Sequence, residues 1–329
     1  MHSWIRRRIV LAAPGIFAAY AATAQPKVRR VGVLSPRARA TPSNPEPLYD
    51  GFTQGMRELG YVDGKNIAIE WRFAEGRPER FPGLAAELVR LNVEVILTGG
   101  QAPTRALQLA TTSIPIVTGA LNDPVGSGFA KSLARPGGNI TGLSLVSVDV
   151  TPKQLELLKE LLPKLSTVGV LLNPDNTSLL GLVSGVRAAA EKMGIAVRAV
   201  EANSVTQIEQ AFASLARDRV DGTIVLPDTY LLGQARPIAG SALKHRMPTI
   251  FGIREFVVAG GLMSYGQNIF EFYRRAAVFV DKILKGAKPA ELPFEQPTQI
   301  HFALNRKTAN SLGLKPSRDL LFRLDELIE

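Results

Sequence analysis

The chain has 329 residues, of which 46% are hydrophobic and 21% charged, a composition that allows packed cores and excludes an intrinsically disordered chain. The formal net charge is +10, but basic and acidic residues are interspersed without a run of five like charges, which argues against nucleic-acid binding. Because the sequence contains no cysteine, disulfides, thiol nucleophiles, cysteine-bound metals and a lipid anchor on cysteine are excluded. The length predicts two domains.

The first 24 residues have the layout of a secretory signal peptide. Three arginines at 6–8 precede an apolar stretch over 9–22, and alanines occupy positions 22 and 24. A retained membrane anchor is the alternative, but the stretch is shorter than the roughly 20 residues that a span needs. We therefore expect export to a periplasm-like compartment, removal of residues 1–24 and no lipid anchor. The adjacent arginines leave both the general and the twin-arginine export routes open.

From residue 28 onward, short β-branched runs alternate with segments of helical spacing. Strands are expected at 28–35, 66–74, 93–100, 114–120 and 139–146, with helices at 45–61, 78–92, 102–112 and 125–138. The pattern then starts again, with strands at 166–174, 195–202, 220–228, 247–252 and 260–266 and helices at 151–163, 178–194, 205–218 and 231–246. This alternation predicts right-handed βαβ crossovers and two parallel sheets covered by helices.

The C-terminal part of the chain predicts how the two units are connected. A long amphipathic helix ends at Gly286, an extended segment follows over 294–305, and a short helix pair closes the chain. A final helix and strand that rejoin earlier units require the chain to cross between the lobes more than once. That connectivity is typical of a two-lobed hinge protein.

Ligands of open α/β sheets bind outside the carboxyl ends of the strands, so polar residues directly after each apolar run are the candidate site. These are Ser35, 99–104, Asn122, Asp123, 173–178, 228–230, 252–255 and 264–267. In the glycine-rich segment 122–142, Asp123 and Ser127 are expected to cap a helix, and the later glycines end it. Only Asn122 and Asp123 of that segment are placed at the cleft.

Two strand ends carry the sharpest signals. At 99–104, two glycines and Pro103 begin a helix whose free N–H groups suit a carboxylate, although a cap that binds only water remains an alternative. Asp228 follows an apolar run directly and can accept hydrogen bonds from a ligand ammonium, or serve only as a helix N-cap. Asn173, Asn176 and Tyr265 add hydrogen-bonding groups and a stacking face.

Catalytic patterns find little support in this sequence. The three histidines, His2, His245 and His301, have no partner nearby in the sequence, and the GxSxG and HExxH motifs are absent. Neither a P-loop nor a dinucleotide-binding glycine pattern occurs. We therefore expect a binding protein, not an enzyme, with no cofactor and no metal.

Four segments together carry a resemblance to a known family: "GFTQGMRELGYVDGKNIAIEWRFAEG", "NDPVGSGFAKSLARPGGNITGLS", "FVVAGGLMSYG" and "VDKILKGAKPAELPFEQPTQIHFALNRKTANSLGL". They resemble the ABC-transporter substrate-binding proteins of the tryptophan- and tyrosine-binding type, over about 28–329. The resemblance implies a type I periplasmic binding fold, an α/β architecture of two Rossmann-like doubly wound lobes joined by a three-crossover hinge. The N-terminal lobe would take 28–145 plus 267–292, and the C-terminal lobe 146–266 plus 293–329.

The resemblance also implies partners and a site. A periplasmic monomer would close on a small ligand, an amino acid or another aromatic or carboxylate compound, and deliver it to an inner-membrane ABC permease and ATPase. Hinge strands are expected near 142–146, 265–268 and 296–299. The ligand-binding residues carried over from the family are Ser35, Gly100, Gln101, Thr104, Asp123, Asn173, Asn176, Asp228 and Tyr265. An exported α/β enzyme and a ligand sensor of the same fold are the alternatives. The sequence shows no catalytic residues for the first and no N-terminal DNA-binding motif for the second.

Overall fold

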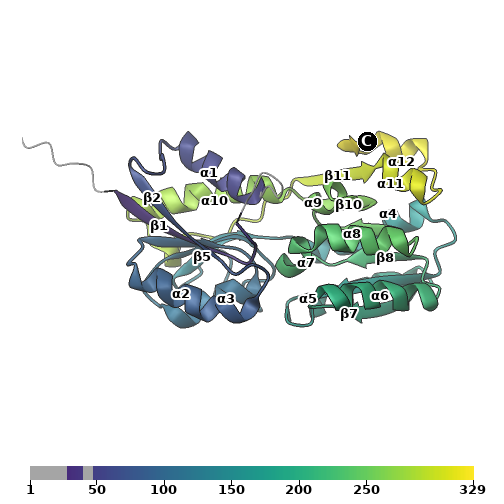
Figure 1. Ribbon diagram of the computed structural model, residues 1–329, viewed down its shortest axis with the longest axis horizontal. Helices are drawn as coiled ribbons and strands as arrows, with labels where there is room; N and C mark the ends of the chain where they lie inside the picture. The colour runs from purple at the N-terminus through teal and green to yellow at the C-terminus, as the bar shows by residue number, and fades with distance from the viewer. Residues whose placement is uncertain (1–27, 40–46) are drawn as a thin grey trace, which may run out of the picture.

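Two lobes lie side by side in the computed structural model, which describes residues 28–39 and 47–329 (Figure 1). The predicted signal peptide lies outside the described residues. The first lobe contains β1 (Arg29–Ser35), α1 (Pro47–Glu58), β2 (Ile67–Phe73), η1 (Pro78–Arg80), α2 (Phe81–Arg90), β3 (Val95–Thr98), α3 (Gln101–Ala110), β4 (Ile116–Leu121) and β5 (Ile140–Ser144). Its five-stranded sheet has the order β2-β1-β3-β4-β5 and is parallel throughout.

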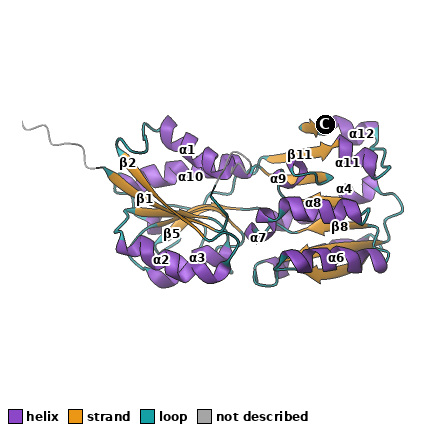
Figure 2. Ribbon diagram, viewed as in Figure 1, coloured by secondary structure: helices purple, strands orange, loops and turns teal. Residues whose placement is uncertain are grey.

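The second lobe begins after β5 and holds a seven-stranded sheet, β12-β11-β10-β9-β8-β6-β7. Its elements are α4 (Ser147–Leu161), β6 (Thr167–Leu172), α5 (Leu179–Lys192), β7 (Ala196–Glu201), α6 (Val205–Arg217), β8 (Gly222–Val225), α7 (Thr229–Gly233), α8 (Ala235–Lys244), β9 (Thr249–Phe251), α9 (Glu255–Val258), β10 (Met263–Gln267), β11 (Ile300–Asn305), α11 (Arg306–Ser311), α12 (Arg318–Phe322) and β12 (Glu326–Ile328). Only the β10–β11 pair in this sheet is antiparallel. Helices cover both sheets (Figure 2), which confirms the predicted fold class.

Helix α10 (Ile269–Leu284) follows a strand of the second lobe but packs in the first, against α1 (Figure 1). Glycines one helical turn apart in α1 make this close packing feasible. A Cβ added at Gly51 would lie 2.6 Å from the backbone oxygen of Phe270, and one at Gly55 would overlap the backbone oxygen of Arg274. Side chains at these two positions would therefore push the helices apart.

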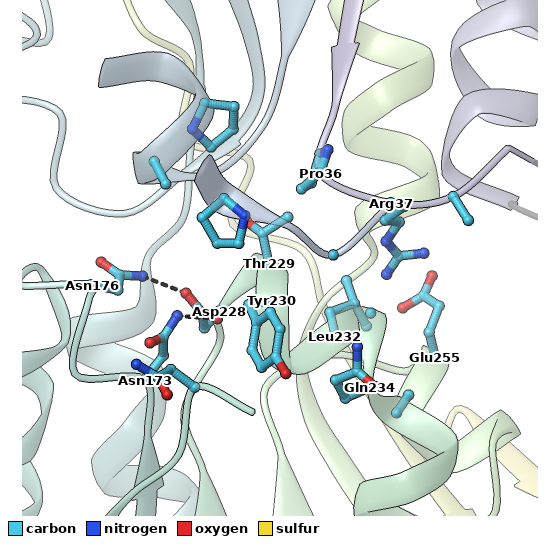
Figure 3. Close-up of a pocket in the computed structure, with 18 of the residues that line it drawn as sticks. Pro36, Arg37, Asn173, Asn176, Asp228, Thr229, Tyr230, Leu232, Gln234 and Glu255 are labelled. Atoms are coloured by element: carbon cyan, nitrogen blue, oxygen red, sulfur yellow. Dashed lines mark hydrogen bonds between the residues drawn. The ribbon is translucent and has the colours of Figure 1, made fainter. Parts of the chain in front are cut away.

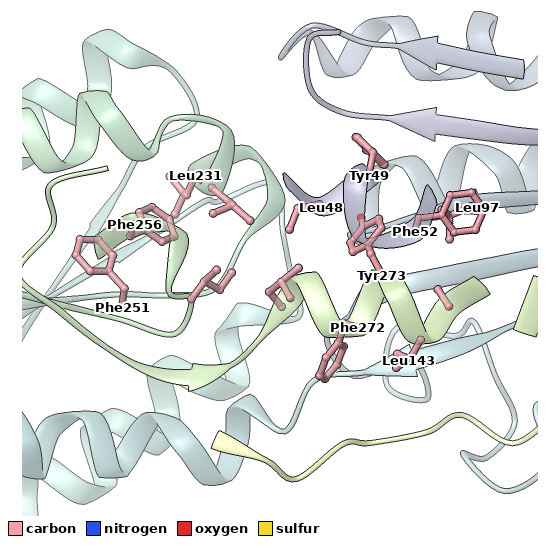
Figure 4. Close-up of a cluster of buried hydrophobic side chains, with 14 of the residues drawn as sticks. Leu48, Tyr49, Phe52, Leu97, Leu143, Leu231, Phe251, Phe256, Phe272 and Tyr273 are labelled. Atoms are coloured by element: carbon pink, nitrogen blue, oxygen red, sulfur yellow. The ribbon is translucent and has the colours of Figure 1, made fainter. Parts of the chain in front are cut away.

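A buried hydrophobic cluster continues from one lobe into the other. It contains Leu48 and Phe52 of α1, Tyr273 of α10, and Leu231 and Phe256 of the second lobe (Figure 4). Because burial of apolar surface is the main favourable contribution to association, this cluster stabilises the arrangement in which the lobes are in contact.

The predicted helix at 125–138 is wrong, because residues 122–138 form a series of turns. The Asp123 carboxylate accepts a hydrogen bond from the Gly126 backbone N–H at 2.8 Å, which closes a tight turn. Gly128 and Gly137 adopt φ values of +73° and +72°, a left-handed conformation that a right-handed helix cannot contain. The glycine-rich segment is therefore a structured loop of the first lobe.

Three segments of the described chain cross between the lobes, at 145–146, at Asn268 and at 294–299. The Gln267 side chain joins them, since its Oε1 accepts from the Val146 N–H at 2.9 Å and its Nε2 donates to the Pro297 carbonyl. Another bond runs from the Ser144 N–H to the Glu295 carbonyl at 2.9 Å. The crossovers thus form one hydrogen-bonded hinge.

Replacing Gln267 with leucine should destabilise this hinge. Gln267 is 4% exposed, and the change removes its two hydrogen bonds, to the half-buried Val146 N–H and Pro297 carbonyl, at a cost of about 1–3 kcal/mol. Urea unfolding measures the loss. The matched control is Gln299→Leu, at an exposed position in the same hinge segment, where we expect a change within about 0.5 kcal/mol. Equal effects at the two positions would contradict the role of Gln267.

A second stabilising contact is the hydrogen bond from the Tyr61 hydroxyl to Asp281 Oδ1 at 2.9 Å. Its contribution to stability should be lost at alkaline pH. Burial and this bond raise the pKa of Tyr61 to about 12, whereas an unfolded tyrosine ionises near pH 10. The stability that Tyr61 contributes is therefore complete below about pH 10 and is lost between about pH 10 and 12. In denaturant titrations, the stability difference between the native protein and Tyr61→Phe should shrink over this interval; a constant difference would contradict it.

Candidate functional site

A cavity of about 700 Å³ lies between the two lobes. The first lobe contributes Arg37 after β1, Gly76 after β2 and the start of α3, and the second contributes loops after β6, β8 and β9. Figure 3 shows side chains of both lobes converging on this space. The cavity therefore lies at the carboxyl ends of parallel strands, where α/β sheets bind ligands, and its volume suits a small molecule.

Asp228 is held by three hydrogen bonds on one side of the cavity. Its Oδ1 accepts from Asn173 Nδ2 at 3.1 Å and from the Leu231 N–H at 3.0 Å, while Oδ2 accepts from Asn176 Nδ2 at 2.9 Å. The bond to Leu231 makes Asp228 the N-cap of α7. Both roles that the sequence allowed for Asp228, helix cap and cleft acid, are thus compatible in one side chain (Figure 3).

The start of α3 faces the same cavity from the first lobe. Gly100 is the N-cap of this helix, with a φ of +88° and no side-chain cap, and Gln101, Ala102 and Pro103 line the cavity. The first N–H groups of a helix have no partner within the helix and carry partial positive charge. This end of α3 can therefore accept a carboxylate.

Contacts between the lobes surround the cavity. Asn122 Nδ2 donates to the Pro227 carbonyl at 3.0 Å, and Asn122 Oδ1 accepts from the Ser147 hydroxyl at 2.8 Å. Gln101 Nε2 donates to Thr177 Oγ1 at 3.4 Å. These bonds require the lobes to be close together, so the structure shows a closed arrangement.

Aromatic rings and charged groups form the rest of the wall. Phe81 and Phe270 line the cavity beside Tyr230, whose pKa is raised by burial and by the negative charge of Asp228, so its phenol stays protonated at neutral pH. At the far end the side chains of Arg37 and Glu255 point toward one another from opposite lobes (Figure 3). The site thus combines apolar surface with groups of both charges.

The structure brings together five of the nine residues that the sequence proposed for the site. Gln101, Asn173, Asn176 and Asp228 line the 700 Å³ cavity, and Gly100 lines a small adjoining hollow. The other four lie elsewhere. The buried Ser35 hydroxyl accepts from the Arg37 N–H, and the Thr104 hydroxyl donates to the Gly100 carbonyl. Asp123 lies in an exposed turn, and the Tyr265 ring packs edge-on against Phe302.

Several cavity residues were missed by the sequence reasoning. Arg37 lies two residues beyond the end of β1, and Gln234 lies in the break between α7 and α8, which the sequence predicted as one helix. Phe270 belongs to the helix that returns to the first lobe. Extending the strand-end search by two residues would have found Arg37, whereas Gln234 and Phe270 carry no local signal.

The described residues contain no metal-binding cluster and no helix that could span a membrane. No group of three histidine, cysteine or acidic side chains among them is placed to hold a metal ion. In residues 28–39 and 47–329, no helix combines the length and the apolar character needed to cross a membrane.

The fold and the interlobe cavity define a two-lobed binding protein of the type I periplasmic class. A family model described as ABC transporter substrate binding protein matches residues 43–328, and the chain belongs to that family. The tyrosine-binding protein of Clostridioides difficile (strain R20291) is 27% identical over 266 residues, which are 80% of this chain and 76% of that protein. Members of the family and this relative are substrate-binding proteins.

Two solved structures, one with a ligand and one without, can be compared with the lobe arrangement of this chain. The ABC domain from Streptococcus pneumoniae in complex with L-Trp has a TM-score of 0.83, with 26% identity and coverage of 92% of this chain and 100% of that one. A ligand-free, open substrate-binding protein with adhesive properties from Clostridium difficile has a TM-score of 0.64, also with 26% identity, covering 92% of this chain and 99% of that one. The lobes here thus lie closer to the arrangement in the L-Trp complex, in agreement with their hydrogen bonds across the cavity.

Proposed function

We propose that this protein is the exported binding component of an ABC importer. It closes on a small ligand between lobes formed by 28–145 plus 267–292 and by 146–266 plus 293–329. As a periplasmic monomer it delivers the ligand to an inner-membrane permease and its ATPase. Membership of the substrate-binding family, the closed two-lobed cavity and the signal-like N-terminal sequence support this proposal.

The proposed ligand is an amino acid, with aromatic side chains favoured. The observation that carries this proposal is the pairing of Asp228 and the start of α3 on opposite walls of one cavity. A free amino acid presents an ammonium group and a carboxylate, so Asp228 would accept from the first and the α3 N–H groups would donate to the second. Tyr230, Phe81 and Phe270 would pack against an aromatic side chain.

A ligand screen on the mature protein, beginning at Gln25, tests this function. We expect tyrosine or tryptophan to raise the melting temperature, because a ligand that binds only the folded state stabilises it by mass action. Calorimetry on the hits would then give affinities. Sugars, aromatic acids and small peptides serve as the comparison set. A rise in melting temperature with sugars alone would contradict the amino-acid assignment. So would the absence of any rise with tyrosine, tryptophan and the comparison compounds.

A further inference from the structure

Two asparagines face Asp228 with amide orientations that the chain itself determines. Asn173 Oδ1 accepts from the Asp175 N–H at 3.1 Å, and Asn176 Oδ1 accepts from the Ser178 hydroxyl at 2.6 Å. The Asp175 N–H can only donate, which directs the Asn173 amide oxygen toward it, and the Asp228 carboxylate oxygens can only accept, which directs both amide nitrogens toward Asp228. The donors around Asp228 are therefore in place without any ligand.

These hydrogen bonds occupy most of the acceptor positions of the Asp228 carboxylate. A carboxylate can accept about four hydrogen bonds, and Asp228 already accepts two on Oδ1 and one on Oδ2 from described residues. Asp228 is 8% exposed and lines the cavity. About one acceptor position, on Oδ2, thus remains for a donor from the ligand.

The whole cluster belongs to one lobe. Asn173 and Asn176 follow β6, and Asp228 follows β8, the neighbouring strand in the second sheet. Opening of the hinge therefore does not separate these groups. They therefore form a preformed group on the second lobe, whether the lobes are open or closed.

We propose that Asn173 and Asn176 are positioning residues that hold Asp228 so that its open acceptor position selects ligands with an ammonium group. The inference rests on the proposed function, in which Asp228 accepts from the ligand. The sequence predicted that the two asparagines contact the ligand. In this proposal they act on the ligand only through Asp228. Loss of their amides releases the carboxylate into other rotamers, which weakens binding of an amine but not binding of the same molecule without its amine.

Calorimetry with two matched probes tests this proposal: tyrosine, and 3-(4-hydroxyphenyl)propionate, which lacks only the ammonium group. The native protein should bind tyrosine far more tightly than the desamino acid. In the double variant Asn173→Ala/Asn176→Ala, we expect this preference to fall at least about 10-fold, through weaker tyrosine binding alone. A parallel loss of affinity for both probes would overturn the proposal, because a merely structural role affects both equally.

Gln54→Ala is the matched control. Gln54 also donates its amide to a carboxylate, Glu58 Oε1, at 2.9 Å, but it lies on the exposed side of α1 and is not among the residues that line the cavity. We expect its substitution to leave the preference for tyrosine unchanged. An equal drop in this control would contradict a specific role of the two asparagines.

A ligand-free crystal structure of the double variant tests the positioning role separately from the proposed function. The expected result is an Asp228 carboxylate that is displaced or divided between rotamers, whereas an unchanged carboxylate would overturn the inference. If the native protein binds neither probe and Asp228 moves in the variant, the amino-acid function fails while the positioning role stands. Native binding of both probes with equal affinity would overturn the selection for an ammonium group.

Discussion

Replacing Gly100 with alanine is expected to weaken ligand binding by up to about 100-fold while the fold remains intact. Gly100 of the first lobe packs directly on Thr229 of the second, so an added Cβ would overlap the Thr229 hydroxyl and lie 2.9 Å from the Thr229 Cβ. Overpacking of this kind costs about 1–3 kcal/mol, which corresponds to a loss of up to about 100-fold in affinity when closure is needed for binding. Calorimetry measures the affinity, and solution scattering measures whether the lobes still close.

Gly128→Ala separates this steric effect from backbone strain. Gly128 also has a positive φ, +73°, but an added Cβ there meets no atom within 4 Å. Its substitution carries the conformational cost alone, about 1–2 kcal/mol, and should leave the affinity unchanged. Adding Thr229→Gly to the Gly100→Ala variant should restore part of the binding. Normal closure of the Gly100→Ala protein would show that the two lobes do not meet at this point.

Asp228→Asn should have the second large effect, a loss of ligand affinity of at least about 30-fold. Removing one partner of a buried charged pair costs about 2–5 kcal/mol, and the amide presents an NH₂ group where the carboxylate accepts bonds. The N-cap bond to the Leu231 N–H remains, because asparagine is as good an N-cap as aspartate, but the new amide NH₂ faces the Asn176 amide donor, so the melting temperature should fall as well. Calorimetry with tyrosine and a thermal melt measure the two quantities.

Asp123→Asn is the control for this charge removal. Its carboxylate also accepts a backbone N–H bond, from Gly126, but in an exposed turn that does not line the cavity. We expect unchanged affinity in this variant. An Asp228→Asn protein that binds tyrosine as tightly as the native protein would remove Asp228 from the site.

The sequence predicted the strands well because their signal is local. Every strand from β1 to β11 overlaps a predicted extended segment, since a buried parallel strand is a short apolar run between turn residues. The helix expected at 125–138 failed because two glycines in left-handed conformations outweighed the apolar spacing. The three-residue strand β12 was missed because it is too short to show a period and depends on pairing with β11.

The site was only partly predictable for a different reason. Asp228, Asn173 and Asn176 were found because residues after neighbouring parallel strands converge at one edge of a sheet. Tyr265 was misplaced because side chains alternate between the two faces of a strand, and the second-lobe core takes this ring beside Phe302. Position along the chain gives the end of a strand but not the direction of each side chain.

By itself, the sequence determined the α/β class, the two-lobed connectivity and the family, because these follow from periodicity and from motifs within continuous segments. The tertiary structure alone decided which groups meet across the cavity: Gly100 against Thr229, Asn122 against Pro227, and Arg37 opposite Glu255. These pairs come from distant segments on different lobes. Their proximity depends on the return of α10 to the first lobe and on the closed hinge, which no local pattern encodes.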